Sequence, residues 1–348
     1  MSLFSEEQLD SPSGFFPAYP GQTLNHGRWK VLRKLGWGPR SSAWLVDDTK
    51  SSDNIEVVKI FTVASTEDTT ANKELSVYKA LGANHFELPV LRENFIEKSE
   101  KGHHLCLVFH ALSGVSIEQF RQSGALPLHI VKQVVSKILD SLVELHETNV
   151  MHGAVTLDNF LFETVQEADD IRASELPAKV VKVTANDGVV YSTVKSQPLP
   201  VDVTSSSSRQ NFANVSLKLA NLSHAKFLKQ DKSVDTSISA FFAPEVLQGE
   251  EPYAKSDVWL LGCSVYLMLT GVPLFSESSV AHYTEVLSTL EDRLKVTHKV
   301  AESDISASVE FLRSCLDMSP ATRSSSSELL DLKWVMEGDV CSCGYCVT

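Results

Sequence analysis

Hydrophobic and polar positions follow two different periods in the two parts of the chain. In the first part, short runs rich in β-branched and aromatic residues predict strands at 29–35, 43–47 and 56–61. Apolar residues at helical spacing predict one helix there, at 71–81. In the second part, the same spacing over 130–148 predicts a long amphipathic helix. A β-rich part followed by a mainly helical part predicts an α+β fold with two lobes.

A nearly uncharged run at 258–275 has 18 residues and must be compared with a membrane span. It follows Asp257 directly and contains Gly262, Ser264 and Thr270. These residues fit a buried central helix better than a lipid-facing one. We therefore expect no membrane contact.

Composition narrows the classes of partner. The chain has 348 residues, 43% of them hydrophobic, which is enough to fill the core of two lobes. Its net charge of −13 argues against nucleic-acid binding and favours a basic partner, although an ordinary acidic surface would look the same. The first residues hold no secretory signal, so we expect an intracellular protein, cytoplasmic or nuclear.

Glycines and one lysine mark a candidate phosphate site. Gly36 and Gly38, with Ser41 three residues later, lie between two β-rich runs. A backbone that approaches a phosphate closely needs residues without bulky side chains. Lys59 lies in the next predicted strand, and Glu74 lies 15 residues further on in the predicted helix, where it could pair with Lys59.

A second motif follows the long helix. His152 and Asn159 stand seven positions apart, with Gly153 and Ala154 directly after the histidine. This frame, together with the glycine hairpin and Lys59, resembles the eukaryotic protein kinases and their H-R-D-x-x-x-x-N catalytic loop. The resemblance implies that Lys59 holds the α and β phosphates of ATP. It also implies that Ala154 stands at the position of the catalytic base, so that no catalytic base is intact.

The resemblance continues towards the C-terminus and covers roughly residues 20–338. Residues 241–245 read Phe-Phe-Ala-Pro-Glu, which matches the kinase A-P-E element. The resemblance implies that Glu245 and Arg323 form the buried ion pair of the kinase C-lobe. It also implies that Asp257 holds the catalytic-loop backbone by hydrogen bonds.

The metal-binding D-F-G motif is altered as well. Asn221, Leu222 and Ser223 stand where the family has Asp, Phe and Gly. The resemblance makes Asn159 and Asn221 the metal positions. Asparagine brings no negative charge to a cation that prefers anionic oxygen, so we expect Mg²⁺ binding to be weakened. Ser223 also lacks the freedom of glycine to adopt positive φ.

Three local features point to the SR-protein kinases, which phosphorylate serines in Arg/Ser-rich proteins. The first is the sequence around the glycine hairpin, Arg-Lys-Leu-Gly-Trp-Gly at 33–38. The second is a strand that ends at Phe109 before a hinge with Ala111 and Leu112, and the third is a long insertion after the catalytic loop. By this resemblance Phe109 narrows access behind the adenine, and Ala43 leaves the roof of the pocket less filled than valine would.

These motifs predict the organisation of the chain. Residues 1–20 form a tail, 27–112 a kinase-like N-lobe and 113–338 a kinase-like C-lobe. An inserted loop region occupies about 163–215 within the C-lobe, and 339–348 form a cysteine-containing tail.

The insertion and the last residues leave alternatives open. Asn159 and Asn221 are 62 positions apart, and the excess chain is either a docking or regulatory insertion or a tolerated surface loop. A local hairpin is expected at 180–183 and 189–194, around the Asn-Asp-Gly turn at 186–188. Cys341, Cys343 and Cys346 could bind metal or carry palmitate, or they belong to a disordered tail.

The function predicted from the sequence is that of a pseudokinase. It would be a binding or regulatory module that could hold ATP and that has a protein partner, basic and Arg/Ser-rich. One alternative is an active Ser/Thr kinase with atypical metal use. Another is a structural partner-binding protein that never meets ATP.

Overall fold

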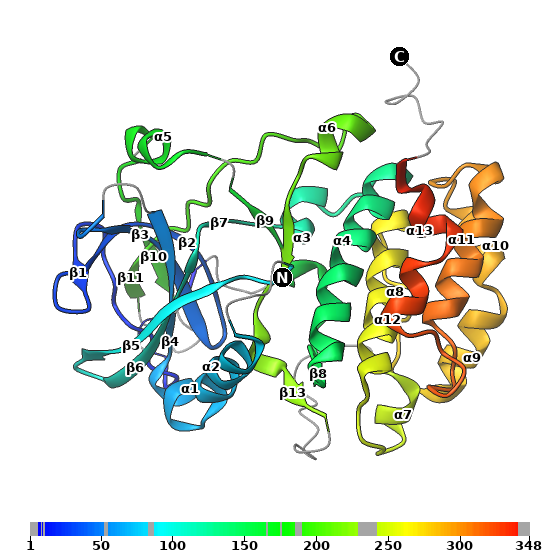
Figure 1. The fold of residues 1–348 in the computed structure, drawn as a ribbon, viewed down its shortest axis with the longest axis horizontal. Helices are drawn as coiled ribbons and strands as arrows, with labels where there is room; N and C mark the ends of the chain where they lie inside the picture. The colour runs from blue at the N-terminus through cyan, green and yellow to red at the C-terminus, as the bar shows by residue number, and fades with distance from the viewer. Residues whose placement is uncertain are drawn as a thin grey trace. The chain divides into compact units, whose positions relative to one another are not determined.

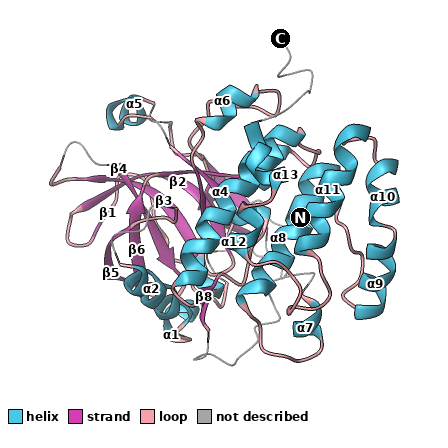
Figure 2. Cartoon of the chain, turned by 45° about the vertical axis from the view of Figure 1, so that its right-hand side comes forward, coloured by secondary structure: helices cyan, strands magenta, loops and turns pink. Residues whose placement is uncertain are grey.

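The computed structural model describes residues 6–7, 9, 11–51, 55–82, 87–164, 166–174, 176–184, 190–228 and 242–339. The chain divides into two compact units. The first unit contains residues 1–115 and 163–201, and the second unit contains residues 116–162 and 202–348. Strands are concentrated in the first unit and helices in the second (Figure 2). This confirms the predicted α+β fold.

A six-stranded antiparallel sheet forms the first unit, in the order β1-β2-β3-β4-β6-β5 (Figure 1). The strands are β1 (Thr23–Leu24), β2 (Trp29–Gly38), β3 (Ser41–Asp48), β4 (Ile55–Phe61), β5 (Leu91–Ser99) and β6 (Gly102–His110). The three strands predicted in this region correspond to β2, β3 and β4. Helices α1 (Val63–Glu67) and α2 (Thr70–Leu81) follow β4, and α2 matches the predicted helix.

Described residues of the expected N-terminal tail belong to the core of the first unit. Phe15 and Phe16 are each 4% exposed. Lys34 on β2 is completely buried and forms ion pairs with Glu6 and Glu7. Burial raises the pKa of Glu7, although the Lys34 charge opposes that shift. The structure therefore differs from the expectation of a separate tail at 1–20.

The insertion is divided between the two units. It contains α5 (Ala168–Ala173) and a hairpin of β10 (Val180–Thr184) and β11 (Val190–Val194), which corresponds to the predicted hairpin. The Asn-Asp-Gly turn at 186–188 lies outside the described residues. Residues 163–201 pack with the first unit, and only the remainder packs with the second. This differs from the expectation that the whole insertion belongs to the C-lobe.

The second unit is mainly helical. Its helices are α3 (Ile117–Arg121), α4 (Leu128–Glu147), α6 (Arg209–Ala213), α7 (Pro244–Leu247), α8 (Ala254–Thr270), α9 (Val280–Ser288), α10 (Leu290–Val296), α11 (Glu302–Cys315), α12 (Ser326–Leu330) and α13 (Lys333–Met336). The predicted long helix is α4, and α8 contains most of the uncharged run. Within the described ranges, no helix combines the length and the apolar character needed to cross a membrane.

Short strands and 3₁₀ turns complete this part of the chain. They are β8 (Val150–Met151), η1 (Leu157–Asn159), β9 (Phe160–Glu163), β12 (Leu217–Leu219), η2 (Leu222–His224), β13 (Lys226–Phe227) and η3 (Glu337–Asp339). Strand β7 (Leu112–Ser116) spans the first boundary between the units along the chain. The pairing of β12 with β9 brings the segment around Asn221 back to the segment around Asn159.

Candidate functional site

The glycine hairpin leaves open space above its backbone. Gly36 lies opposite Ala43 in the sheet, and Gly38 lies opposite Ser41. Neither glycine has positive φ, and a Cβ atom added to either would meet no described atom within 4 Å. The local backbone therefore does not require glycine at these two positions. The open space is what the close approach of a ligand phosphate would need.

Lys59 is held beside this hairpin by strand pairing and by an ion pair. On β4, Lys59 lies directly opposite Ala43, which itself lies opposite Gly36. The Lys59 Nζ atom donates to both carboxylate oxygens of Glu74 on α2, each at 2.8 Å. The Glu74 side chain is 1% exposed and the Lys59 side chain 13%. A charge-assisted pair of this kind fixes the position of the ammonium group.

The predicted gatekeeper and hinge are next to each other at the end of β6. Phe109 is 6% exposed, and its ring centre lies 4.9 Å from that of Tyr78 on α2. Burial raises the pKa of Tyr78 well above its ordinary value, which keeps the hydroxyl neutral. Ala111 and Leu112 follow β6 directly, and Leu112 is buried. Contact of these residues with an adenine stays a prediction.

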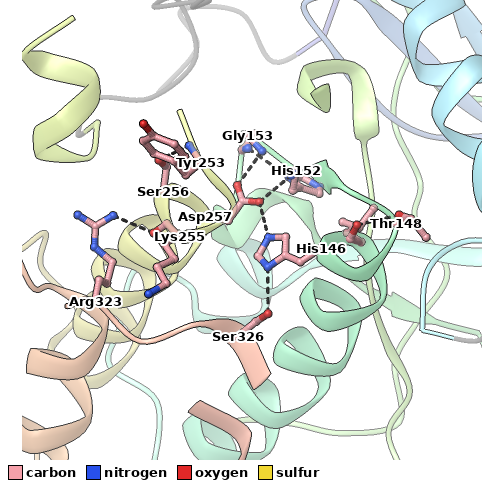
Figure 3. Close-up of polar contacts among 12 residues, drawn as sticks. His146, Thr148, His152, Gly153, Tyr253, Lys255, Ser256, Asp257, Arg323 and Ser326 are labelled. Atoms are coloured by element: carbon pink, nitrogen blue, oxygen red, sulfur yellow. Dashed lines mark hydrogen bonds and ion pairs between the residues drawn. The ribbon is translucent and has the colours of Figure 1, made fainter. Parts of the chain in front are cut away.

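In the second unit, Asp257 on α8 binds the backbone of the predicted catalytic loop (Figure 3). Its Oδ2 atom accepts from the His152 amide at 2.7 Å, and its Oδ1 atom accepts from the Gly153 amide at 2.8 Å. The His146 Nε2 atom lies 3.0 Å from Oδ2, while His146 Nδ1 lies 2.9 Å from the Ser326 hydroxyl. The role predicted for Asp257 is thus confirmed, and His146 and Ser326 extend it.

Further hydrogen bonds and a close backbone contact position the loop around His152. Ala154 donates its amide to His152 Nδ1 at 3.1 Å, so Nε2 carries the proton and donates to the Ala220 carbonyl at 3.0 Å. Gly153 has a φ of 75°, and a Cβ there would lie 2.6 Å from the His224 carbonyl oxygen. Glycine at this position therefore suits both the backbone conformation and the close contact.

Asn159 and Asn221 are joined by a neutral hydrogen-bond chain. Asn221 Nδ2 donates to Asn159 Oδ1 at 3.1 Å, and the Ser223 hydroxyl donates to Asn221 Oδ1 at 2.7 Å. Asn159 Nδ2 donates to the Ala154 carbonyl at 2.8 Å. Asn221 has a φ of 69°, a left-handed conformation that asparagine tolerates well, whereas Ser223 does not have positive φ. The left-handed position is thus Asn221, and the loss of glycine at Ser223 causes no strain there.

A buried ion pair anchors the second unit. Arg323 donates from Nη1 and Nη2 to the two carboxylate oxygens of Glu245, at 2.8 and 2.9 Å. The Ser256 hydroxyl donates to the same carboxylate at 2.7 Å. Burial alone would raise the pKa of Glu245, but the bonds and charge of Arg323 hold it below its ordinary value. The predicted Glu245–Arg323 pair is confirmed, while Phe241 lies outside the described residues.

Comparison with known proteins assigns this arrangement to a family. The model of the protein kinase domain matches residues 29–335, well over half of the chain. The chain belongs to the protein kinase domain family. The solved kinase domain of PF14_0431 covers 92% of this chain, and this chain covers 98% of it, with a TM-score of 0.62. Since the two share 19% identity, this likeness bears on the fold alone.

Several curated relatives are SR-protein kinases or similar to them. Serine/threonine-protein kinase SRPK of Physarum polycephalum is 24% identical over 75% of this chain and 65% of its own length. Protein kinase dsk1 of Schizosaccharomyces pombe is 28% identical over 64% of this chain and 38% of its own length. Serine/threonine-protein kinase SKY1 of Saccharomyces cerevisiae is 27% identical over 46% of this chain and 23% of its own length. The chain therefore spans less than two thirds of the length of these relatives, and the predicted similarity to SR-protein kinases is confirmed.

The two residues at the predicted metal positions, Asn159 and Asn221, do not fit Mg²⁺ well. Both are neutral amides, and the Oδ1 atom of each already accepts a hydrogen bond. Moreover, Asn221 directs an N–H donor at Asn159 Oδ1, which is the oxygen that a cation would need. Throughout the described ranges, no group of three or more His, Cys, Asp or Glu side chains could hold a metal ion. Cys341, Cys343 and Cys346 lie outside those ranges.

The sequence motifs locate the candidate positions in this chain but do not predict all of their partners. They mark Ser223 only as a lost glycine, whereas its hydroxyl completes the asparagine chain. They assign no role to His146, which bridges Asp257 and Ser326. One signal was available, since a serine two residues after an asparagine is within reach for a local side-chain hydrogen bond.

Proposed function

We propose that this kinase-family chain is a pseudokinase, a binding or regulatory module that does not transfer phosphate. The observation that carries this proposal is the neutral chain of Asn159, Asn221 and Ser223 beside Ala154. Phosphoryl transfer depends mainly on positioning and on charge neutralisation by metal ions. Here the predicted metal positions hold amides whose oxygens accept from Asn221 and Ser223, and the predicted base position holds a methyl group.

The expected loss of phosphoryl-transfer rate is large enough to favour a protein without kinase activity. Removal of a general base typically lowers a rate by about 10²–10⁴. Kinases turn over about 1–100 times per second, so this loss alone leaves very slow transfer. Weakened metal binding at Asn221 would reduce the rate further, because the metal neutralises charge in the transition state.

ATP is the nucleotide that the first unit could hold. Lys59 and the open space above Gly36 and Gly38 suit its phosphates. Ala111 and Leu112 are the hinge positions proposed for its adenine. Relatives of this family use ATP with Mg²⁺ in general, but the two asparagines favour binding that does not depend on Mg²⁺.

A basic, Arg/Ser-rich protein is the proposed partner. The net charge of −13 would attract such a segment. Among the relatives, SRSF protein kinase 3 of Mus musculus is 28% identical over 45% of this chain. The proposal involves no nucleic acid and no membrane.

Restoring the two acidic residues tests the proposal. Transfer of labelled γ-phosphate to an Arg/Ser peptide should be absent in the wild type, in Ala154→Asp and in Asn221→Asp. It should appear only in the double variant. Because Ala154 is 1% exposed, thermal melting must first establish that the Ala154→Asp proteins are folded. Transfer by the wild-type protein that disappears in Lys59→Ala would overturn the proposal and establish an active kinase with atypical metal use.

A further inference from the structure

Part of the insertion covers the sheet face that carries Lys59. Residues that pair directly across antiparallel strands point to the same face, as do residues two apart on one strand. Ala43 pairs with Lys59, and Leu45 pairs with Val57. These four side chains therefore share one face of the sheet. Ala43 is also the residue expected in the roof of the adenine pocket.

Apolar side chains of the insertion complete a buried cluster on this face. Ile171 of α5 and Leu199 belong to the same cluster as Leu35, Leu45 and Val57, with Ala43 and Ala168 packed against it. Ile171 is 2% exposed and Leu199 is 0% exposed. In Figure 1, α5 is drawn beside one end of the sheet, which agrees with this packing. Side chains of the insertion thus cover apolar surface of this face that would otherwise be available to a ligand.

Backbone hydrogen bonds fix the segment that ends at Leu199. The Gln197 amide donates to the Lys34 carbonyl on β2 at 2.7 Å. The Leu199 amide donates to the Ser113 carbonyl, shortly after the hinge, at 2.7 Å. Between them, a Cβ on Gly114 would lie 2.9 Å from Leu35 Cβ and 3.4 Å from Pro198 Cβ, so the segment packs closely where the hinge leaves the sheet.

Polar contacts hold α5 and the start of this segment in place. Arg172 forms an ion pair with Asp47 of β3 at 2.8 Å. Arg33 donates to the Ser174 carbonyl at 2.8 Å. Ser196 donates its amide to Glu6, which also pairs with the buried Lys34. Several different kinds of contact therefore favour the docked position.

We propose that residues 168–174 and 194–199 form a built-in cover that competes with the adenine of a nucleotide for this face. The proposal rests on the proposed function, since it concerns how ATP reaches the same site. When only a fraction of molecules is competent to bind, the measured dissociation constant rises by the inverse of that fraction. Nucleotide binding would then be weak until a partner, or a change in the insertion, displaces the cover.

The proposed competition is tested by measuring how tightly the full chain binds adenosine, and ATP without Mg²⁺. Thermal shift and calorimetry give these affinities. Leu199→Asp should undock the segment and tighten binding of both ligands by at least about tenfold, because a carboxylate is costly in an apolar cluster. Arg172→Ala removes an ion pair whose side chains are 25% and 26% exposed and should tighten binding by less, up to about fivefold. The matched control is Leu176→Asp, since Leu176 lies in the same insertion but is 48% exposed. It should bind like the wild type.

Equal affinity of wild type, Leu199→Asp and Arg172→Ala, all with intact folded spectra, would overturn the cover, as would failure of all of them to bind. The wild type gives an independent test by hydrogen exchange. By linkage, saturating adenosine should speed exchange of the Leu199 amide, and unchanged exchange with adenosine bound would contradict the proposal. Failure of the proposed function would instead appear as phosphate transfer, which these binding measurements do not detect.

Discussion

The polar residues at the two candidate sites differ between the two units. In the first unit, Lys59 and Glu74 retain opposite charges and a two-point contact at 2.8 Å. In the second unit, the predicted metal positions Asn159 and Asn221 are neutral amides joined by one hydrogen bond. The backbone around both sites is well ordered by hydrogen bonds. The difference between the two pairs therefore lies in charge, since the first pair is ionic and the second is neutral.

The framework of the second unit sharpens this contrast. Arg323 and Glu245 are both almost fully buried and form a two-point ion pair. Asp257 is fully buried and still holds the catalytic-loop amides. The second unit thus contains buried charges that support the fold, while the residues at its predicted metal positions are neutral.

The largest effect is expected from breaking the framework pair. Arg323→Met would leave Glu245 buried without its partner, and the free energy of unfolding should fall by about 3–5 kcal/mol. Chemical denaturation measures this, with Lys333→Met as the control, because the Lys333–Glu337 pair is exposed and should contribute less than about 1 kcal/mol. A loss below about 1 kcal/mol for Arg323→Met would contradict the assigned role.

The same pair should appear in the pH dependence of stability. Arg323 holds the pKa of Glu245 below its ordinary value of 4.5, so the stabilisation is present above that value. It is lost as the pH falls through the lower pKa of the folded state. Between pH 6 and pH 3, the free energy of unfolding should therefore decrease more steeply in the wild type than in Glu245→Gln. Parallel curves would show that Glu245 is not the responsible group.

A smaller effect is expected at the charged pair of the first unit. Lys59→Met leaves the buried Glu74 without its donor, and stability should fall by about 1.5–3 kcal/mol. The double variant Lys59→Met/Glu74→Gln should recover part of this loss, because it no longer buries an unpaired charge. A double-mutant cycle by thermal or chemical unfolding measures the coupling, and purely additive losses would refute it.

The smallest effect is expected in the asparagine chain. Ser223→Ala removes the hydroxyl that donates to Asn221 Oδ1 and should cost about 0.5–1.5 kcal/mol of stability. Ser223→Thr keeps a hydroxyl and should lose less. If Ser223→Ala is as stable as the wild type, the hydroxyl does not support Asn221 in solution.

Local pattern predicted much of the fold and of the site. Strand and helix periodicity identified β2, β3, β4, α2 and α4, since each depends on neighbouring residues. Fixed motif spacing identified Lys59, Glu74, Asn159 and Asn221. The pairing of Lys59 with Glu74 followed from that spacing as well.

Contacts between distant parts of the chain could not be predicted in this way. Ile171 and Leu199 join a cluster with Leu45, more than 120 residues earlier, and the six-residue helix α5 is too short for a clear periodic signal. Burial of Phe15 in the expected tail likewise depends on tertiary packing. The direction of each asparagine amide depends on neighbours such as Ser223, so the closed chain at the metal positions became visible only in the structure.

Titration with ATP in the presence and absence of Mg²⁺, monitored by thermal shift, shows whether the predicted metal positions bind Mg²⁺. Ligand at about 100 times its dissociation constant adds roughly 2.7 kcal/mol of stability, which is readily measured. In the wild type, Mg²⁺ should leave the dissociation constant for ATP unchanged, because Asn159 and Asn221 are neutral and their Oδ1 atoms already accept hydrogen bonds from Asn221 and Ser223. In Asn221→Asp, Mg²⁺ should tighten ATP binding. If Mg²⁺ tightens ATP binding tenfold or more in the wild type, the metal site is functional and the chain is not a pseudokinase of the proposed kind.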